Sequence, residues 1–287
     1  SVASIRTKFA RSAIAMSVAA LAAGEASSDY LTGDLVDVSV GSSEGAVTFS
    51  DVVDGAGQKL TIEIDATGTG RRAVLNWSTL NVNTNDTVDF AAPNSVYLNK
   101  APADSATSTF AGTVTGHATA VVIFVDPDGM NVTGTVNSIG GLLVSSVALN
   151  ATFDTAANLV SNVDNYTTIA GAGDGTAVTI GAGGSTASQL RVVGGNSVTI
   201  AGDITANTGI NISTLNTGLA TNAIVLGSGT NTLSSAGTLA INAASGAVDI
   251  KTLVGTADIT AAGVIDVDNA GGDLILKGTG WANNGVI

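Results

Sequence analysis

The sequence predicts an all-β protein, a right-handed parallel β-helix (solenoid) in which short strands wind around one core. Two observations support this fold. Apolar residues alternate with small polar residues in short bursts, as at residues 120–125, and each burst ends at a Pro-Asn, Asp-Gly or Gly-Gly signal. The doublets Val178/Ile180 and Val198/Ile200 repeat 20 residues apart, a spacing that fits one turn of a three-faced β-helix.

The composition agrees with stacked β structure. Of the 287 residues 36 are glycine and only 3 are proline, the charged share is 11% and the hydrophobic share is 45%. This combination argues against disorder, which requires high charge and little apolar content. Because the composition is uniform after residue 30 or so, we expect one continuous body rather than two domains.

Charge and cysteine content narrow the choice of partners. The net charge of −13 disfavours nucleic acid and anionic lipid as partners. With no cysteine, the chain has neither a disulfide framework nor thiol chemistry. Such a chain suits export across an outer membrane in unfolded form, because premature cross-links cannot form. A stable cytosolic protein can lack cysteine equally well.

Residues 1–26 differ in kind from the rest. Three basic residues, Arg6, Lys8 and Arg11, precede an alanine-rich apolar run at 12–24. This order is typical of a secretory signal segment. The alternative is a retained short helix that caps the fold or docks on a neighbouring copy. In either case the run is too short to span a bilayer.

Residues 27–72 are expected to form an amino-terminal cap and the first turns of the solenoid. Candidate strands lie at 35–40 and 46–53, and residues 60–65 alternate cleanly between apolar and polar. Terminal repeats of solenoids are atypical because they shield the open end of the core.

Residues 73–154 carry the strongest strand bursts, and residues 155–287 are expected to form regular turns. In such turns each strand pairs with its equivalents above and below, while stacked Val, Ile, Leu and Ala fill a narrow interior. The doublets that mark these strands are Val178/Ile180, Val198/Ile200, Ile210/Ile212, Ile224/Leu226, Leu239/Ile241, Val248/Ile250, Ile265/Val267 and Leu274/Leu276.

Four motifs occur in a fixed order between residues 60 and 154. They read W-S-x-L-N-V, V-D-F-x-x-P-N-S-x-x-x-L-N-K, V-x-x-F-V-D-P-D-G-M and G-G-L-L-V-S-S. In this order they resemble the haemagglutination-activity, or two-partner-secretion, domain of the filamentous haemagglutinin family. The turn and secretion-motif candidates that carry the resemblance are Trp77, Pro93, Asn94, Asn99, Asp126, Pro127, Asp128 and Gly129.

Two positions depart from the family pattern. The family usually reads N-P-N-G where this chain has D-P-D-G at residues 126–129, and an arginine often stands where this chain has Lys100. Both departures keep the turn, because Asp and Asn cap turns alike and glycine supplies a positive φ. We therefore expect Gly129 to occupy a positive-φ corner after the strand at 121–125.

The resemblance implies a secreted or surface-attached bacterial exoprotein with a structural or adhesive role. It implies an outer-membrane transporter as partner and a host, cell or matrix surface as target. From the residues themselves we expect no cofactor. Two other functions stay open: the subunit of a filament that polymerises end to end through homopolymer contacts, and a β-helical enzyme that acts on polysaccharides. The carboxy-terminal residues stay apolar and strand-like to within a few residues of Ile287, which favours end-to-end contacts.

No residue is assigned a catalytic, metal-binding or cofactor-binding role. The lone histidine, His117, lies in a Gly/Thr loop, where solvation is the ordinary state. Asp126 and Asp128 fit turn capping better than a calcium loop, which needs six or more oxygens at fixed intervals. Scattered aspartates leave weak surface calcium binding open, and the scarcity of glutamate argues against a glycosidase-like carboxylate pair, so we expect no enzyme. Trp77 fits a core or cap position better than a sugar-stacking platform.

Overall fold

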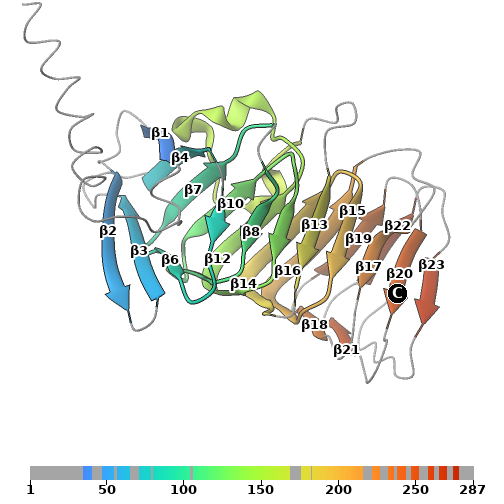
Figure 1. Ribbon diagram of the computed structural model, residues 1–287. Coiled ribbons are helices and arrows are strands. Elements are labelled where there is room, and N and C mark those ends of the chain that lie inside the picture. Colours follow the sequence, from blue (N-terminus) through green and yellow to red (C-terminus); the bar gives the residue numbers. More distant parts are fainter. Residues whose placement is uncertain are drawn as a thin grey trace, which may run out of the picture.

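A parallel β-helix forms the body of the protein in a computed structural model. The structure describes residues 35–40, 47–54, 57–64, 71–78, 80–103, 106–168, 176–181, 183–215, 222–226, 232–235, 238–243, 247–251, 258–261, 265–269 and 274–277. The predicted signal or helical segment at 1–26 lies outside the described residues, as do residues 278–287. Figure 1 shows the strands following one another along a single elongated stack.

Each turn of the helix contributes strands to three faces. The first face contains β3 (Gly57–Ile64), β6 (Thr87–Phe90), β9 (Thr113–Gly116), the first halves of β12 (Thr135–Ser145), β14 (Ser185–Gly194) and β16 (Ile204–Thr214), and then β18 (Thr232–Ser235) and β21 (Asp258–Ala261). The second face contains β4 (Arg71–Trp77), β7 (Ser95–Lys100), β10 (Val121–Val125), the second halves of β12, β14 and β16, and then β19 (Thr238–Ala243) and β22 (Ile265–Asn269).

The third face is a separate sheet of eight strands. It contains β5 (Asn81–Val82), β8 (Ser108–Phe110), β11 (Met130–Val132), β13 (Ala177–Ile180), β15 (Ser197–Ile200), β17 (Asn222–Leu226), β20 (Ala247–Lys251) and β23 (Leu274–Lys277). The first two faces join into a 15-stranded sheet because β12, β14 and β16 run continuously around the corner between them. The β12–β14 register shifts between Val136 and Ile139, which is the irregularity that lets a strand bend.

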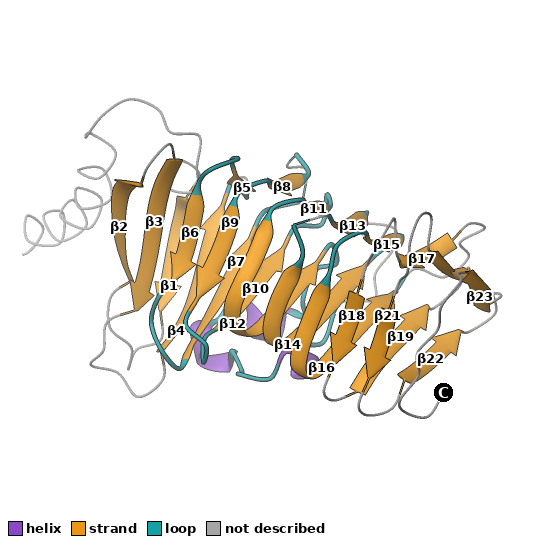
Figure 2. Cartoon of the chain, turned by 90° about the horizontal axis from the view of Figure 1, so that it is seen from below, coloured by secondary structure: helices purple, strands orange, loops and turns teal. Residues whose placement is uncertain are grey.

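Two strands in the region where the sequence predicted a cap, 27–72, pair antiparallel with the first strands of the solenoid. β1 (Leu35–Val40) pairs antiparallel with β4, and β2 (Val47–Asp54) pairs antiparallel with β3. The ladders from β3 and β4 onward are parallel. Figure 2 shows β2 and β3 at one end of the stack and β22 and β23 near the other. The cap therefore ends the parallel ladder by reversing the direction of the chain.

The 20-residue repeat predicted from the sequence is one turn of the helix. Val178 pairs in register with Val198, and Ile180 pairs with Ile200. All eight predicted doublets fall on strands, from β13 to β23. The predicted regular turns resume at β13, however, and not at residue 155, because residues 147–168 leave the solenoid.

The interior is filled by columns of side chains that repeat in register. One column on the second face passes through Tyr97, Val122, Leu142, Leu190 and Ile210, all buried. Near the amino-terminal end the filling is aromatic: the Phe90 and Tyr97 ring centroids are 4.9 Å apart, and those of Phe110 and Phe124 are 4.7 Å apart. Edge-on and tilted ring contacts of this kind add to the stabilisation that burial provides.

Helix in the described residues is limited to three short 3-10 turns. They are η2 (Ala151–Asp154), η3 (Ala156–Asn158) and η4 (Val163–Asn165). The sequence predicted helix almost only at 1–26, so these turns were not foreseen. Figures 1 and 2 place them outside the solenoid, against the second face. We call residues 147–166 the cover.

Candidate functional site

The D-P-D-G motif forms a tight corner between β10 and β11. The Gly129 amide donates to the Asp126 carbonyl oxygen at 3.0 Å, which closes the turn. Gly129 has φ +109°, as the sequence predicted, and a Cβ there would meet Thr176 of the next turn and lie 3.0 Å from the Ala177 carbonyl oxygen. Both backbone conformation and crowding therefore require glycine.

The Asp126 side chain ties this corner to the preceding turn. Its carboxylate is fully buried and accepts from the Ser108 amide at 3.0 Å, the Ser108 hydroxyl at 2.5 Å and the Asp128 amide at 2.9 Å. Burial raises the pKa of Asp126, and the hydrogen bonds from Ser108 and Asp128 oppose that rise. Among the described residues, no group of three or more His, Cys, Asp or Glu side chains could hold a metal ion. The contacts of Asp126 thus fit turn capping.

The Pro-Asn motif forms a different corner, between β6 and β7. Asn94 has φ +52°, and its amide donates to the Thr119 hydroxyl at 2.9 Å. The Pro93 carbonyl oxygen accepts from Arg71 Nη1 at 2.9 Å. Side chains from the turns before and after therefore both hold this corner. His117 lies beside it, with Nδ1 2.9 Å from the Thr119 hydroxyl oxygen, as part of the corner turn.

Trp77 and Asn99 meet inside the solenoid. Trp77 is 1% exposed, and its indole Nε1 donates to Asn99 Oδ1 at 3.1 Å. The Asn99 amide nitrogen in turn donates to the Ile123 carbonyl oxygen at 3.2 Å. A buried indole offers no face to a sugar, so the core interpretation of Trp77 holds. Asn99 is a polar link in an otherwise apolar column, satisfied by turns on both sides.

The motif residues do not converge on one site. Asn94 precedes a strand of the second face and Asp126 follows one, so the two corners are separated by about 16 Å, the length of a five-residue strand. Trp77 and Asn99, 22 residues apart in the sequence, are brought together by a hydrogen bond. The motif residues therefore lie on consecutive turns of the solenoid, and hydrogen bonds join each of these turns to the next.

The sequence analysis missed a second apolar cluster, on the outer side of the second face. Two of its columns are Val74–Leu98–Ile123–Leu143 and Val96–Val121. The cover lies on them through Val147, Leu149, Leu159, Val163 and Tyr166. The signal that was available is the continuous apolar run of β10, whose five residues are all buried. A strand that is buried on both sides has a continuous run of apolar residues, and not an alternation of apolar and polar residues.

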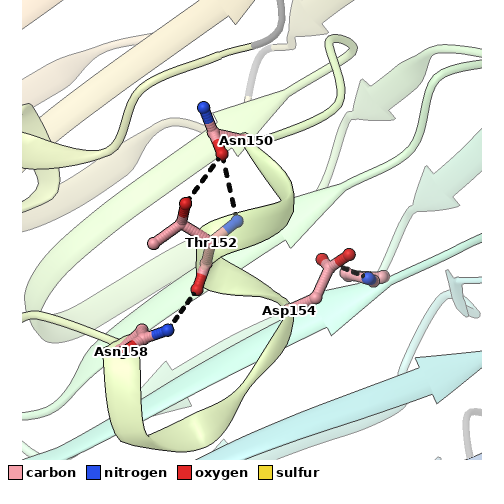
Figure 3. A network of polar contacts seen from close by, with 5 residues as sticks. Asn150, Thr152, Asp154 and Asn158 are labelled. Carbon is pink, nitrogen blue, oxygen red and sulfur yellow. Dashed lines mark hydrogen bonds and ion pairs between the residues drawn. The ribbon is translucent and has the colours of Figure 1, made fainter.

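Polar side chains within the cover join its own turns. Asn150 Oδ1 caps η2 by accepting from the Thr152 amide at 3.0 Å and the Thr152 hydroxyl at 2.9 Å. Asn158 Nδ2 donates to the Thr152 carbonyl oxygen at 2.7 Å, so η2 and η3 are joined. Figure 3 shows this network, with Asp154 projecting away from it. Asp154 forms an ion pair with Lys100 of β7, at 2.7 Å.

At the other end, β14 holds the cover through two polar side chains. Arg191 Nη1 donates to three carbonyl oxygens, those of Tyr166 at 2.7 Å and of Val163 and Asp164 at 3.2 Å each. Gln189 donates to the Asp164 carboxylate at 2.5 Å and accepts from the Val163 amide at 3.3 Å. Burial lowers the pKa of Arg191, and the charge of Asp164 opposes this.

Arg191 also marks where the outer apolar column ends. It is the register partner of Leu143, and Asn211 follows it in the next turn. The solenoid continues beyond this point with an apolar interior, for example at Ile212, which is fully buried. The column through Leu143 therefore becomes polar at Arg191 and Asn211, and both side chains contact the cover at Asp164, while Val193 remains in the outer cluster.

Comparison with solved structures supports the fold. The structure of the HMW1 secretion domain from Haemophilus influenzae matches with a TM-score of 0.53 and 15% sequence identity, over 87% of this chain and 73% of that one. The filamentous hemagglutinin secretion domain matches with a TM-score of 0.47 and 14% identity, over 88% of this chain and 99% of that one. The HMW1 likeness confirms, at the level of the fold, the two-partner-secretion resemblance that the motifs indicated.

Sequence comparisons add no relative. No protein-family model matches the chain. No curated protein matches it significantly. Within the part of the chain that the structure describes, no helix is long and apolar enough to cross a membrane.

Proposed function

We propose that this chain is the secretion-domain region of an exported bacterial protein, and that its β-helix serves a structural or adhesive role at the cell surface. The observation that carries the proposal is the fold: a capped parallel β-helix that matches the HMW1 secretion domain over 87% of the chain. The ordered motifs between residues 60 and 154 support it independently, because they were identified from the sequence alone.

The physical character of the chain suits this role. The parallel ladder has no open side edge along its length, which protects an extended β-sheet from unwanted pairing. The net charge of −13 keeps such a surface soluble, and the absence of cysteine removes cross-links that would block passage as an unfolded chain. By its resemblance, the chain has an outer-membrane transporter as its export partner and a host, cell or matrix surface as its target.

Localisation and transporter dependence test the proposal together. Antibody raised against the purified chain is used on intact cells, on fractions and on the culture medium of the bacterium that encodes it. We expect the antigen in the medium or on the surface, accessible to added protease, and retained in the periplasm when the outer-membrane transporter is deleted. An antigen found only in the cytoplasm would contradict the proposal.

Assembly into filaments stays a prediction, and only the two ends of the described sheets bear on it. At the amino-terminal end of the described strands, antiparallel β2 pairs with β3 and antiparallel β1 with β4, while the third face ends at β5. At the other end the third face finishes at β23, which pairs on one side with β20. Sedimentation velocity of the intact chain at tens of micromolar decides this, because fibres and monomers sediment very differently. The absence of enzyme activity likewise stays a prediction.

A further inference from the structure

We propose that the cover is a latch that closes only after β14 has joined the sheet, so that β14 locks the apolar outer face of the earlier turns. The cover, residues 147–166, follows β12 in the chain and precedes β14. Most of the apolar side chains under it belong to turns that come earlier in the chain, but the cluster also includes Val193 of β14, and polar side chains of β14 hold the second half of the cover. This proposal concerns local folding and requires no assumption about export.

The first half of the cover is held weakly by polar contacts. Its ion pair to the solenoid, Lys100–Asp154, joins two partly exposed side chains, at 26% and 47% exposure. Exposed pairs of this kind contribute little net stability. The hydrogen bonds of Asn150 and Asn158 lie within the cover and shape it, but they do not attach it to the solenoid.

The second half depends on β14. The carbonyl groups at the end of a 3-10 turn have no partner within the turn. Here the carbonyl oxygens of Val163, Asp164 and Tyr166 converge on a single guanidinium nitrogen of Arg191. Gln189, two residues earlier on the same strand, engages Val163 and Asp164. Before β14 pairs with the sheet, these carbonyl groups lack their hydrogen bonds to Arg191, and the second half of the cover is not fixed over the apolar outer face.

The dependence runs in one direction. β14 is paired along its length with β12 on one side and β16 on the other. Its inward residues Leu190 and Val192 are buried in the main core, away from the cover, whereas its outward residue Val193 is buried in the outer cluster with the cover. Ladder pairing on both sides and the burial of Leu190 and Val192 therefore hold most of β14 in the sheet when the cover is open, while the cover requires β14.

Hydrogen exchange measured by mass spectrometry on the full chain tests the latch. In Arg191→Met, which keeps much of the aliphatic stem and removes the donors, we expect amides of residues 147–166 to exchange about tenfold or more faster. Amides of β7 and β10 should keep their protection. Arg191→Lys, which retains a charged donor, should recover part of the protection of the cover.

Arg71→Met is the matched control. Arg71 also donates to a backbone carbonyl from Nη1, that of Pro93 at 2.9 Å, but at a corner outside the cover. We expect its cover to exchange as in the parent chain. An unchanged cover in Arg191→Met, or equal acceleration of every turn, would overturn the latch.

Two further variants test the direction of coupling. Leu190→Ala loosens β14 from the inside without touching the cover, and we expect β14 and residues 147–166 to lose protection together. Leu159→Ala loosens the cover, and β14 should keep its protection. A cover that stays protected in Leu190→Ala, or a β14 that opens with the cover in Leu159→Ala, would contradict the proposed order.

Discussion

The two sides of one sheet are buried in different ways. On the inner side of the second face, apolar columns run from the cap into the later turns, as Tyr97, Val122, Leu142, Leu190 and Ile210 do. On the outer side, the column through Val74 reaches Leu143 and then changes to Arg191. The inner core is produced by repetition, so it extends with each turn. The outer core exists once and requires a dedicated segment of chain to cover it.

The largest loss of stability is expected from a substitution in the inner core. Phe124→Ala should lower the free energy of unfolding by about 3–5 kcal/mol, because it leaves a cavity and removes ring contacts. The Phe124 ring lies 4.7 Å from that of Phe110 and 5.8 Å from that of Phe90, between centroids. Urea denaturation measures the change. A loss below about 1 kcal/mol would mean that the inner columns are not close-packed.

The neighbouring residue tests the outer core. Ile123 is fully buried but points to the opposite side of β10 from Phe124. Ile123→Ala should lower stability by about 2–4 kcal/mol and should expose the cover to limited proteolysis. If Ile123→Ala lowers the free energy of unfolding by no more than about 0.5 kcal/mol, as substitutions of exposed residues do, the cover does not pack on β10.

Alkaline pH, with a Tyr166 variant as reference, tests the burial of Tyr166 in the cover. Burial raises the pKa of Tyr166 to about 12 from an ordinary value of 10.0. The unfolded chain ionises first, so the contribution is complete below pH 10 and is lost as pH rises toward 12. The expected loss is about 2 to 3 kcal/mol. Over this pH range Tyr166→Phe should lose less stability than the parent chain. If both proteins lose the same stability, groups other than Tyr166 cause the loss.

A smaller effect is expected at the D-P-D-G corner. Gly129→Val should lower stability by about 1 kcal/mol or more, since a β-branched residue is strained at positive φ and the site is crowded. Asp128→Asn, which restores an amide at the third position of the motif, serves as control and should change stability little. An unchanged melting temperature in Gly129→Val would contradict the observed corner.

The smallest effect is expected at the ion pair between cover and solenoid. Lys100→Met should lower stability by less than about 1 kcal/mol, because both charges are partly exposed. The effect should shrink further at high salt. A loss of several kcal/mol, independent of salt, would make this pair and not β14 the main attachment of the cover.

The repetitive part of the molecule was predictable because its causes are local. A doublet such as Val178/Ile180 needs only period-two alternation and a corner signal to be recognised, and its 20-residue spacing gave the partner Val198. Gly129 was predictable for the same reason, since a turn sequence specifies its own φ. The antiparallel pairing of β1 with β4 had no such local signal, whereas Asp54-Gly55 between β2 and β3 is a hairpin signal that the sequence analysis did not use.

The cover was not predictable because its causes are distant in sequence. Each of its 3-10 turns has only three or four residues, so no helical period appears. Its attachments, such as Tyr166 to Arg191, span 25 residues and depend on the register of β14. The continuous apolar run of β10 showed that something must cover that strand, but the run carried no information about which segment does so.

Thiol labelling tests most directly whether one sheet buries two cores. The chain has no cysteine, so an introduced cysteine is its one thiol that can react with the label. We expect Ile123→Cys, beneath the cover, to react with a maleimide as slowly as Val122→Cys in the inner core. Asn211→Cys, at a half-buried position beside Arg191 at the edge of the cover, should react much faster than either. If Ile123→Cys instead reacts as fast as Asn211→Cys in folded protein, the outer face is open and the two-core account is wrong.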